Sequence, residues 1–286
     1  MVDDITFNAV CIVESLPPKE VQTGRILHGY IQTQLADTSL PVDLLYSACS
    51  GVDEFRGVVA SLAEKASERG LLPILHIEAH GSPSEGLCFA DDSFLPWQDF
   101  CDLITPLNRA TGFRLVVVIA ACFGADLLSG VRLSSAAPCF AFIAPSDEID
   151  PGEVMNSFRT LYRTMFDTLD AHKTFQALNN VRLEAGGIII FTAQYWFDLL
   201  MSRYLIENAT RHGIKEFALR RYRSARAAGE VADMTAMKRH FKAALPSIVR
   251  AYFESYFMLK EVSGNDVRFE PLWHEVDGKV KAALRH

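Results

Sequence analysis

Two stretches of the sequence are the most informative about the fold: residues 71–81, LLPILHIEAHG, and residues 114–124, RLVVVIAACFG. Both begin with a run rich in apolar and β-branched residues, which is typical of a buried strand. The first run ends in His80-Gly81, and the second ends in Cys122. Because functional groups in open α/β sheets gather where parallel strands end, these stretches predict a base and a thiol side by side at one edge of a sheet.

The two predicted strand ends carry the groups that cysteine-based hydrolysis needs. A thiol attacks a carbonyl carbon effectively only as the thiolate, and a neighbouring imidazole withdraws its proton and later protonates the leaving amine. His80 and Cys122 supply this pair. Gly81 has no side chain to block a substrate, so its backbone N–H and that of Cys122 would form an oxyanion hole. The motifs therefore predict a cysteine hydrolase.

Alternating strand and helix signals surround the two stretches. The predicted strands cover residues 7–13, 42–46, 71–80, 114–122, 139–144 and 188–197. Helical periodicity fills the intervals, which predicts an α/β fold with a mostly parallel six-stranded sheet and helices on both faces. Beyond about residue 200 every signal is helical. We therefore expect a sheet-containing domain over residues 1–200 and a helical C-terminal region over residues 201–286 packed on it.

Charge is distributed unevenly along the chain. Residues 1–200 hold 12 Lys and Arg against 25 Asp and Glu, whereas residues 201–286 hold 16 against 10. An acidic body argues against nucleic acid as the main partner, because phosphate neutralisation needs clustered positive charge. The basic side chains of the tail are predicted either to be solvated or to bind a regulatory protein partner with an acidic surface. They are Lys215, Arg220, Arg221, Arg223, Arg226, Lys238, Arg239 and Lys242.

Cysteine usage and the N-terminus point to the compartment. The six cysteines have no CxxC spacing, so neither a disulfide framework nor a zinc site is expected. The first residues are acidic and do not resemble a signal peptide, and the most apolar stretch, residues 188–200, is too short to cross a membrane. We expect a cytoplasmic protein without a membrane partner, and the chemistry needs no metal or other cofactor.

The chain resembles the caspase-like cysteine peptidases, the clan of caspases, separases and clostripain, and most closely their bacterial CHAT branch. The resemblance covers roughly residues 5–200. It rests on a strand followed by His80-Gly81, a helix that opens with Trp97, and a second strand followed by Ala121-Cys122-Phe123-Gly124. The Ala-Cys-x-Gly part of the caspase motif is present, but its leading Gln is not.

The resemblance implies a cysteine endopeptidase. It implies His80 as general base and acid, Cys122 as nucleophile through a thioester, and the backbone amides of Gly81 and Cys122 as oxyanion donors. It also implies activation by a partner or signal, and a role in bacterial anti-phage or cell-death defence. Relatives that cut after Lys or Arg often have an acidic residue two positions before the cysteine. This chain has Ala120 there, which does not favour a strongly basic P1 preference.

Other polar residues near the predicted strand ends are also candidates. Asp147 and Asp150 follow the fifth strand and are predicted either to bind substrate or to form an acidic turn that caps a helix. Arg25 is either a contact for a substrate carboxylate or a solvated residue. His76 faces the same way as His80 but lies about 13 Å along the strand, too far to share a metal ion, so we expect a structural role.

Two alternatives to a peptidase stay open. A catalytically silent scaffold of the same fold would bind a partner through its helical tail. A cysteine-dependent hydrolase or transferase would act on small amides or esters. Replacement of Cys122 by Ala tests the first alternative, and a proteome-wide cleavage profile tests the second.

Overall fold

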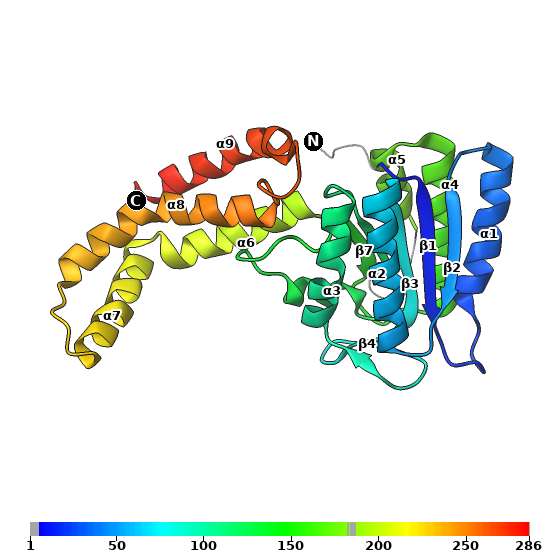
Figure 1. Ribbon diagram of the computed structural model, residues 1–286, viewed down its shortest axis with the longest axis horizontal. Helices are drawn as coiled ribbons and strands as arrows, with labels where there is room; N and C mark the ends of the chain where they lie inside the picture. Colours follow the sequence, from blue (N-terminus) through cyan, green and yellow to red (C-terminus); the bar gives the residue numbers. More distant parts are fainter. Residues whose placement is uncertain (1–5, 182, 184–186, 286) are drawn as a thin grey trace. The chain divides into compact units, whose positions relative to one another are not determined.

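The structure is a computed structural model that describes residues 6–181, 183 and 187–285 of the 286-residue chain. The chain divides into two compact units, shown in Figure 1. The first unit comprises residues 1–131 and 137–193, and the second comprises residues 132–136 and 194–286. Each unit is described separately below.

The first unit is built on a sheet whose main path has the strand order β2-β1-β3-β6-β7-β8. Its strands are β1 (Ala9–Ser15), β2 (Asp43–Ala48), β3 (Pro73–Ser82), β6 (Val116–Ala120), β7 (Ala141–Pro145) and β8 (Ile188–Thr192). All neighbouring pairs are parallel except β7 and β8, which are antiparallel. Two short strands, β4 (Gly86–Cys88) and β5 (Phe94–Leu95), extend the end of β3. The predicted mostly parallel six-stranded α/β fold is confirmed.

Helices cover both faces of this sheet (Figure 1). Helices α1 (Thr23–Thr38) and α4 (Pro151–Thr168) contact each other and lie on the face toward which His76 points, because Thr23 and Tyr162 belong to the hydrogen-bond network of that histidine. Helices α2 (Val52–Arg69) and α3 (Trp97–Ala110) pack together on the other face, where the rings of Phe55 and Phe100 stack at 6.1 Å. The 3₁₀ helix η1 (Gly124–Gly130) and helix α5 (Ala171–Asn179) complete the unit.

The last predicted strand is shorter than expected. The sequence predicts a strand over residues 188–197, but β8 ends at Thr192 and helix α6 (Ala193–Asn208) begins at the next residue. The run is apolar throughout, so its composition alone does not show where extended backbone gives way to helix. The longer segment of the second unit starts at residue 194, within α6.

The second unit is helical, as the sequence predicts for the C-terminal region. It contains α6, α7 (Arg211–Ala227), α8 (Met234–Tyr256) and α9 (Asn265–Ala283). An aromatic cluster forms its core: the ring of Phe197 lies 5.5 Å from that of Phe253 and 5.1 Å from those of Tyr256 and Phe257. Among the helices of the described residues, none is both long and apolar enough to span a bilayer.

Candidate active site

The register of two central strands brings His80 and Cys122 together. Strands β3 and β6 are parallel, and Glu78 pairs with Ala120 at the end of β6. Two residues further along each chain, His80 still belongs to β3, and Cys122 lies in the turn that directly follows β6. Both residues line a single cavity of ≈ 420 Å³. The predicted pair therefore shares one cavity at the carboxyl ends of the parallel strands.

The cavity has apolar walls and a polar end. It opens on the face covered by α1 and α4, and its apolar lining includes Leu16, Val21, Ala120, Ile149 and Val154. Its polar lining includes Glu20, Thr23 and Glu78 besides the histidine and the cysteine. A concave, mostly apolar space with a few convergent polar groups is the usual form of a small-molecule or side-chain binding site. The cavity is therefore suited to hold a substrate side chain next to the Cys122 thiol.

Only glycine fits at position 81. A Cβ atom added to Gly81 would lie 2.0 Å from the carbonyl oxygen of Cys122 and 3.2 Å from the Cβ atom of Ala121. The first distance is far below any normal contact, and the obstacle is backbone, which has no rotamer with which to move aside. The glycine of the His-Gly motif thus allows the two strand ends to approach closely.

A sharp turn follows the cysteine. Phe123 adopts a left-handed conformation with φ of 56°, which is uncommon for a residue other than glycine. Its backbone N–H donates to the carbonyl of Asp147 at 3.3 Å, and η1 begins at the next residue. Gly124 is packed so tightly that an added Cβ atom would lie 3.0 Å from the side chains of Ala144 and Ile119. This turn ends the strand and leaves Cys122 half-buried at the cavity.

A carboxylate that the sequence analysis does not single out pairs with the histidine. The Nε2 atom of His80 lies 2.8 Å from Oε2 of Glu20, which belongs to the loop between β1 and α1. Both side chains are about half exposed. When the proton of the neutral imidazole is on Nε2 and is donated to Glu20, Nδ1 is left as the acceptor. Glu20 lies 60 residues from His80 in the sequence, and no local pattern connects the two.

A buried hydrogen-bond network adjoins the cavity, because two of its members, Thr23 and Glu78, line it. The Nδ1 atom of His76 lies 3.0 Å from the hydroxyl of Tyr162, and its Nε2 atom lies 3.0 Å from Oε1 of Glu78. Thr23 donates its hydroxyl to the other oxygen of Glu78 at 2.7 Å. Burial, with the Glu78 carboxylate nearby, raises the pKa of Tyr162 well above its usual range, so the phenol remains a donor. His76 thus ties helices α1 and α4 to β3, which is a structural role.

The other candidate residues occupy different places. Asp150 caps α4 by accepting from the backbone N–H groups of Gly152 and Glu153 at 2.7 and 3.3 Å, and it also lines a second cavity of ≈ 420 Å³ beside Cys122. The side chain of Asp147 accepts from the backbone N–H of Glu148 and lines neither of the two cavities that contain the cysteine. The guanidinium of Arg25 lies 6.0 Å from the centre of the Tyr46 ring, and Arg25 does not line the cavity that contains His80 and Cys122.

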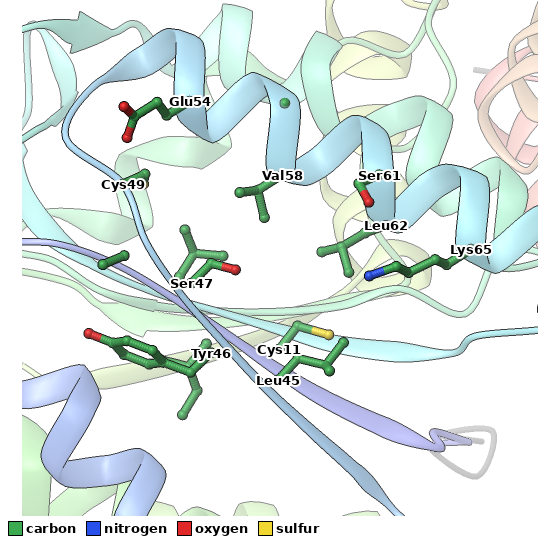
Figure 2. A pocket seen from close by; sticks show the side chains of 14 residues that line it. Cys11, Leu45, Tyr46, Ser47, Cys49, Glu54, Val58, Ser61, Leu62 and Lys65 are labelled. Atoms are coloured by element: carbon green, nitrogen blue, oxygen red, sulfur yellow. The ribbon is translucent and has the colours of Figure 1, made fainter.

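Four of the other five cysteines have raised pKa values and are less suited to chemistry. Figure 2 shows another cavity, of ≈ 570 Å³, between α2 and the strands β1 and β2, with Cys11 and Lys65 at one end of it. Burial raises the pKa of Cys11 to about 12 although the Lys65 ammonium opposes the shift, and burial raises the pKa of Cys49 to about 11. Burial also raises the pKa of Cys139 well above its usual range and that of Cys88 to a smaller extent. These thiols stay protonated near neutral pH.

Alkylation should therefore be selective. We expect iodoacetamide to modify Cys122 before any other cysteine of the native chain near neutral pH. A thiol with a pKa of about 12, such as Cys11, is ionised in only about one molecule in ten thousand at about pH 8, and it is also buried. Peptide mapping by mass spectrometry after partial labelling checks this. Earlier modification of half-buried Cys88 would contradict it, and labelling in denaturant gives the control in which all six cysteines react.

Within the described part of the chain, no group of three or more His, Cys, Asp or Glu side chains is arranged to hold a metal ion. Comparison with models of protein families gives no match, and comparison with curated proteins gives none either.

Proposed function

We propose that this protein is a caspase-like cysteine endopeptidase that uses His80 and Cys122. One observation carries the proposal: a histidine and a half-buried cysteine from neighbouring parallel strand ends line one partly apolar cavity. The strand-His-Gly and Ala-Cys-x-Gly motifs occupy these strand ends, and the mostly parallel sheet agrees with the caspase-like fold. The six free cysteines favour a reducing compartment such as the cytoplasm.

The reaction divides into acylation and deacylation. His80 accepts the proton of Cys122, and the thiolate attacks the carbonyl carbon of the scissile peptide bond. The backbone N–H groups of Gly81 and Cys122 donate to the oxyanion of the tetrahedral intermediate. The intermediate collapses to a thioester while the imidazolium protonates the departing amine. His80 then deprotonates a water molecule, which hydrolyses the thioester, releases the carboxylic acid and restores the thiol.

The resemblance to the CHAT branch supports a regulated enzyme. The resemblance implies peptidases that are often held inactive until a partner or signal orders their loops, and bacterial anti-phage or cell-death defence is the setting we propose. The carboxylate of Glu20 lies in a loop, at the polar end of the cavity and against the base itself. A movement of this loop would therefore change both the cavity and the environment of His80.

Proteome-wide profiling of new protein N-termini tests the proposed function. The chain and its Cys122→Ala variant are expressed in parallel in bacterial cells, and new termini are identified by mass spectrometry. We expect one or a few defined cleavage sites that the variant does not produce. A variant that keeps the biological effect without cleavage would show a scaffold instead. Hydrolysis of small esters with no cleaved protein would show the small-molecule alternative.

Glu20 is expected to assist the histidine without binding substrate. In the Glu20→Ala variant, we expect kcat to fall about 10-fold while KM changes by less than about 2-fold, because the imidazole loses the acceptor that orients it. Glu20→Gln keeps an oxygen acceptor and should show a smaller loss. Steady-state kinetics on a cleaved peptide check this, with Glu68→Ala on the exposed side of α2 as a control. A rise in KM alone would show that Glu20 contacts substrate.

A further inference from the structure

Positive charge in the second unit is concentrated on one helical hairpin. We call residues 211–242 the basic hairpin; it comprises helix α7, the connection after it and the first part of α8. From residue 215 to residue 242 it carries eight Lys and Arg residues against three acidic residues, and no acid occurs between residues 217 and 229. Seven of the eight cations are exposed and Lys238 is half-buried. The basic hairpin is therefore a strongly cationic surface, although the whole chain carries a net negative charge.

These cations are not neutralised within the structure. None of the eight side chains makes an ion pair with another of the residues described. Elsewhere in the second unit several cations are paired: Arg203 pairs with Glu207, and Lys281 pairs with Asp277. A stretch of like charges repels itself and so favours an external anion. The basic hairpin is thus available for such a partner.

Two of the three aromatic residues among the cations, Phe217 and Phe241, have a structural role; the third, Tyr222, is half-buried. The rings of Phe217 and Phe241 stack on each other with centroids 3.7 Å apart and an interplanar angle of 13°. They join α7 to α8, so they are not free to stack on a base. Recognition by this surface would therefore rest on charge and would be insensitive to base sequence.

The lack of exposed apolar anchors disfavours a protein partner. Protein interfaces depend on buried aromatic or aliphatic anchors, and the surrounding charges contribute mainly to association rate and orientation. Within residues 211–242, Val231 in the connection is the one large apolar side chain that is well exposed. Most of the eight cations are arginines, and the planar guanidinium group of an arginine can donate two parallel hydrogen bonds to two oxygens of one phosphate. A polymer of phosphates fits this surface better than an acidic protein does.

The arrangement of the arginines favours a single strand over a duplex. At about 100° per residue, Arg221, Arg223 and Arg226 lie roughly 100°, 300° and 240° around the helix axis from Arg220. The buried Ala218 lies on the remaining side of α7. A flexible strand can follow charges that face several directions, whereas a rigid duplex meets only one side of a helix. We infer that the basic hairpin binds the sugar-phosphate backbone of a single-stranded nucleic acid.

The test measures binding of a labelled single-stranded RNA of about 16 nucleotides by fluorescence anisotropy, a length at the upper end of common single-strand sites. The full chain carries Cys122→Ala, so the result does not depend on peptidase activity. The test variant adds Arg220→Gln, Arg221→Gln, Arg223→Gln and Arg226→Gln. Gln has a helix propensity close to that of Arg, and circular dichroism checks that the helices remain.

A matched control removes the same number of positive charges elsewhere in the second unit. It carries Arg203→Gln, Lys260→Gln, Lys279→Gln and Lys281→Gln, each of which removes a cation that is already paired with an acid. The overall charge of the two variants is therefore equal, and only the position of the removed charges differs.

We expect the parent chain to bind the RNA with an affinity that falls steeply between about 50 and 200 mM salt. The test variant should bind on the order of 30-fold more weakly, with the slope of log K against log salt reduced by about 0.7 for each phosphate that is no longer neutralised. The control should stay within about 3-fold of the parent. Four outcomes would overturn the inference: no RNA binding by the parent, an unaffected test variant, an equal loss in the control, or tighter binding of a duplex or polyglutamate.

Discussion

The Cys122→Ala chain is expected to lose at least about 10⁴-fold in kcat/KM on a peptide that the parent chain cleaves. Without the thiol no thioester forms, and only binding and the oxyanion donors remain to accelerate hydrolysis. His80→Asn should cause a loss of similar size, because the thiol then lacks its base. Since the two residues act as one unit, the double variant should be hardly slower than either single variant.

Two controls distinguish a catalytic effect from a general one. Cys88→Ser replaces a half-buried cysteine that lies opposite His80 in the β3–β4 pairing and should leave kcat/KM within about 3-fold of the parent. The melting temperatures of all variants are measured in parallel. If the double variant loses activity additively, the histidine and the cysteine act independently. If Cys122→Ala keeps its activity, the site assignment is wrong.

The Gly81→Ala chain is expected to lose about 10²-fold or more in kcat/KM, although it changes no reactive atom. The added Cβ atom would lie 2.0 Å from the Cys122 carbonyl oxygen, which is far shorter than a van der Waals contact. The two strand ends must therefore move apart to accommodate it. Overpacking of this kind also lowers the free energy of unfolding by about 1–3 kcal/mol. Kinetics, the alkylation rate of Cys122 and thermal unfolding together measure the effect.

A second glycine supplies the matched control. A Cβ atom added to Gly29, within α1, would have no neighbour within 4 Å. Gly29→Ala should therefore raise the free energy of unfolding by about 0.5–1 kcal/mol and leave kcat/KM unchanged. A Gly81→Ala chain that cleaves as well as the parent would show that close approach of the strand ends is not needed for the reaction.

The strands around the site could be predicted because buried strands are visible as apolar runs. The predicted strands over residues 71–80 and 114–122 correspond to β3 and β6, but β6 ends at Ala120. The left-handed turn at Phe123, which leads directly into η1, ends that strand early. The composition of the apolar run does not indicate this turn. The apolar run over residues 188–197 likewise does not show where the strand ends, and the structure divides it between β8 and α6.

The polar partners of the site could not be predicted. Glu20 lies 60 residues from His80, and Tyr162 lies 86 residues from His76. The hydrophobic periodicity of the sequence indicates whether a residue is buried, but it does not indicate which loop or helix covers the end of a given strand. The strand order, with β1 beside β3, brings the loop after β1 to the end of β3 and so brings Glu20 to the histidine.

The sequence by itself determined the α/β class, the two strand ends that carry His80 and Cys122, and the helical character of the C-terminal region, because each depends on local composition and hydrophobic period. Three features become visible only in the folded chain: the cavity that His80 and Cys122 share, the pairing of Glu20 with the histidine, and the close contact that excludes a side chain at position 81. These features depend on contacts between residues far apart in the chain, and such contacts are set by strand order and packing rather than by any local pattern.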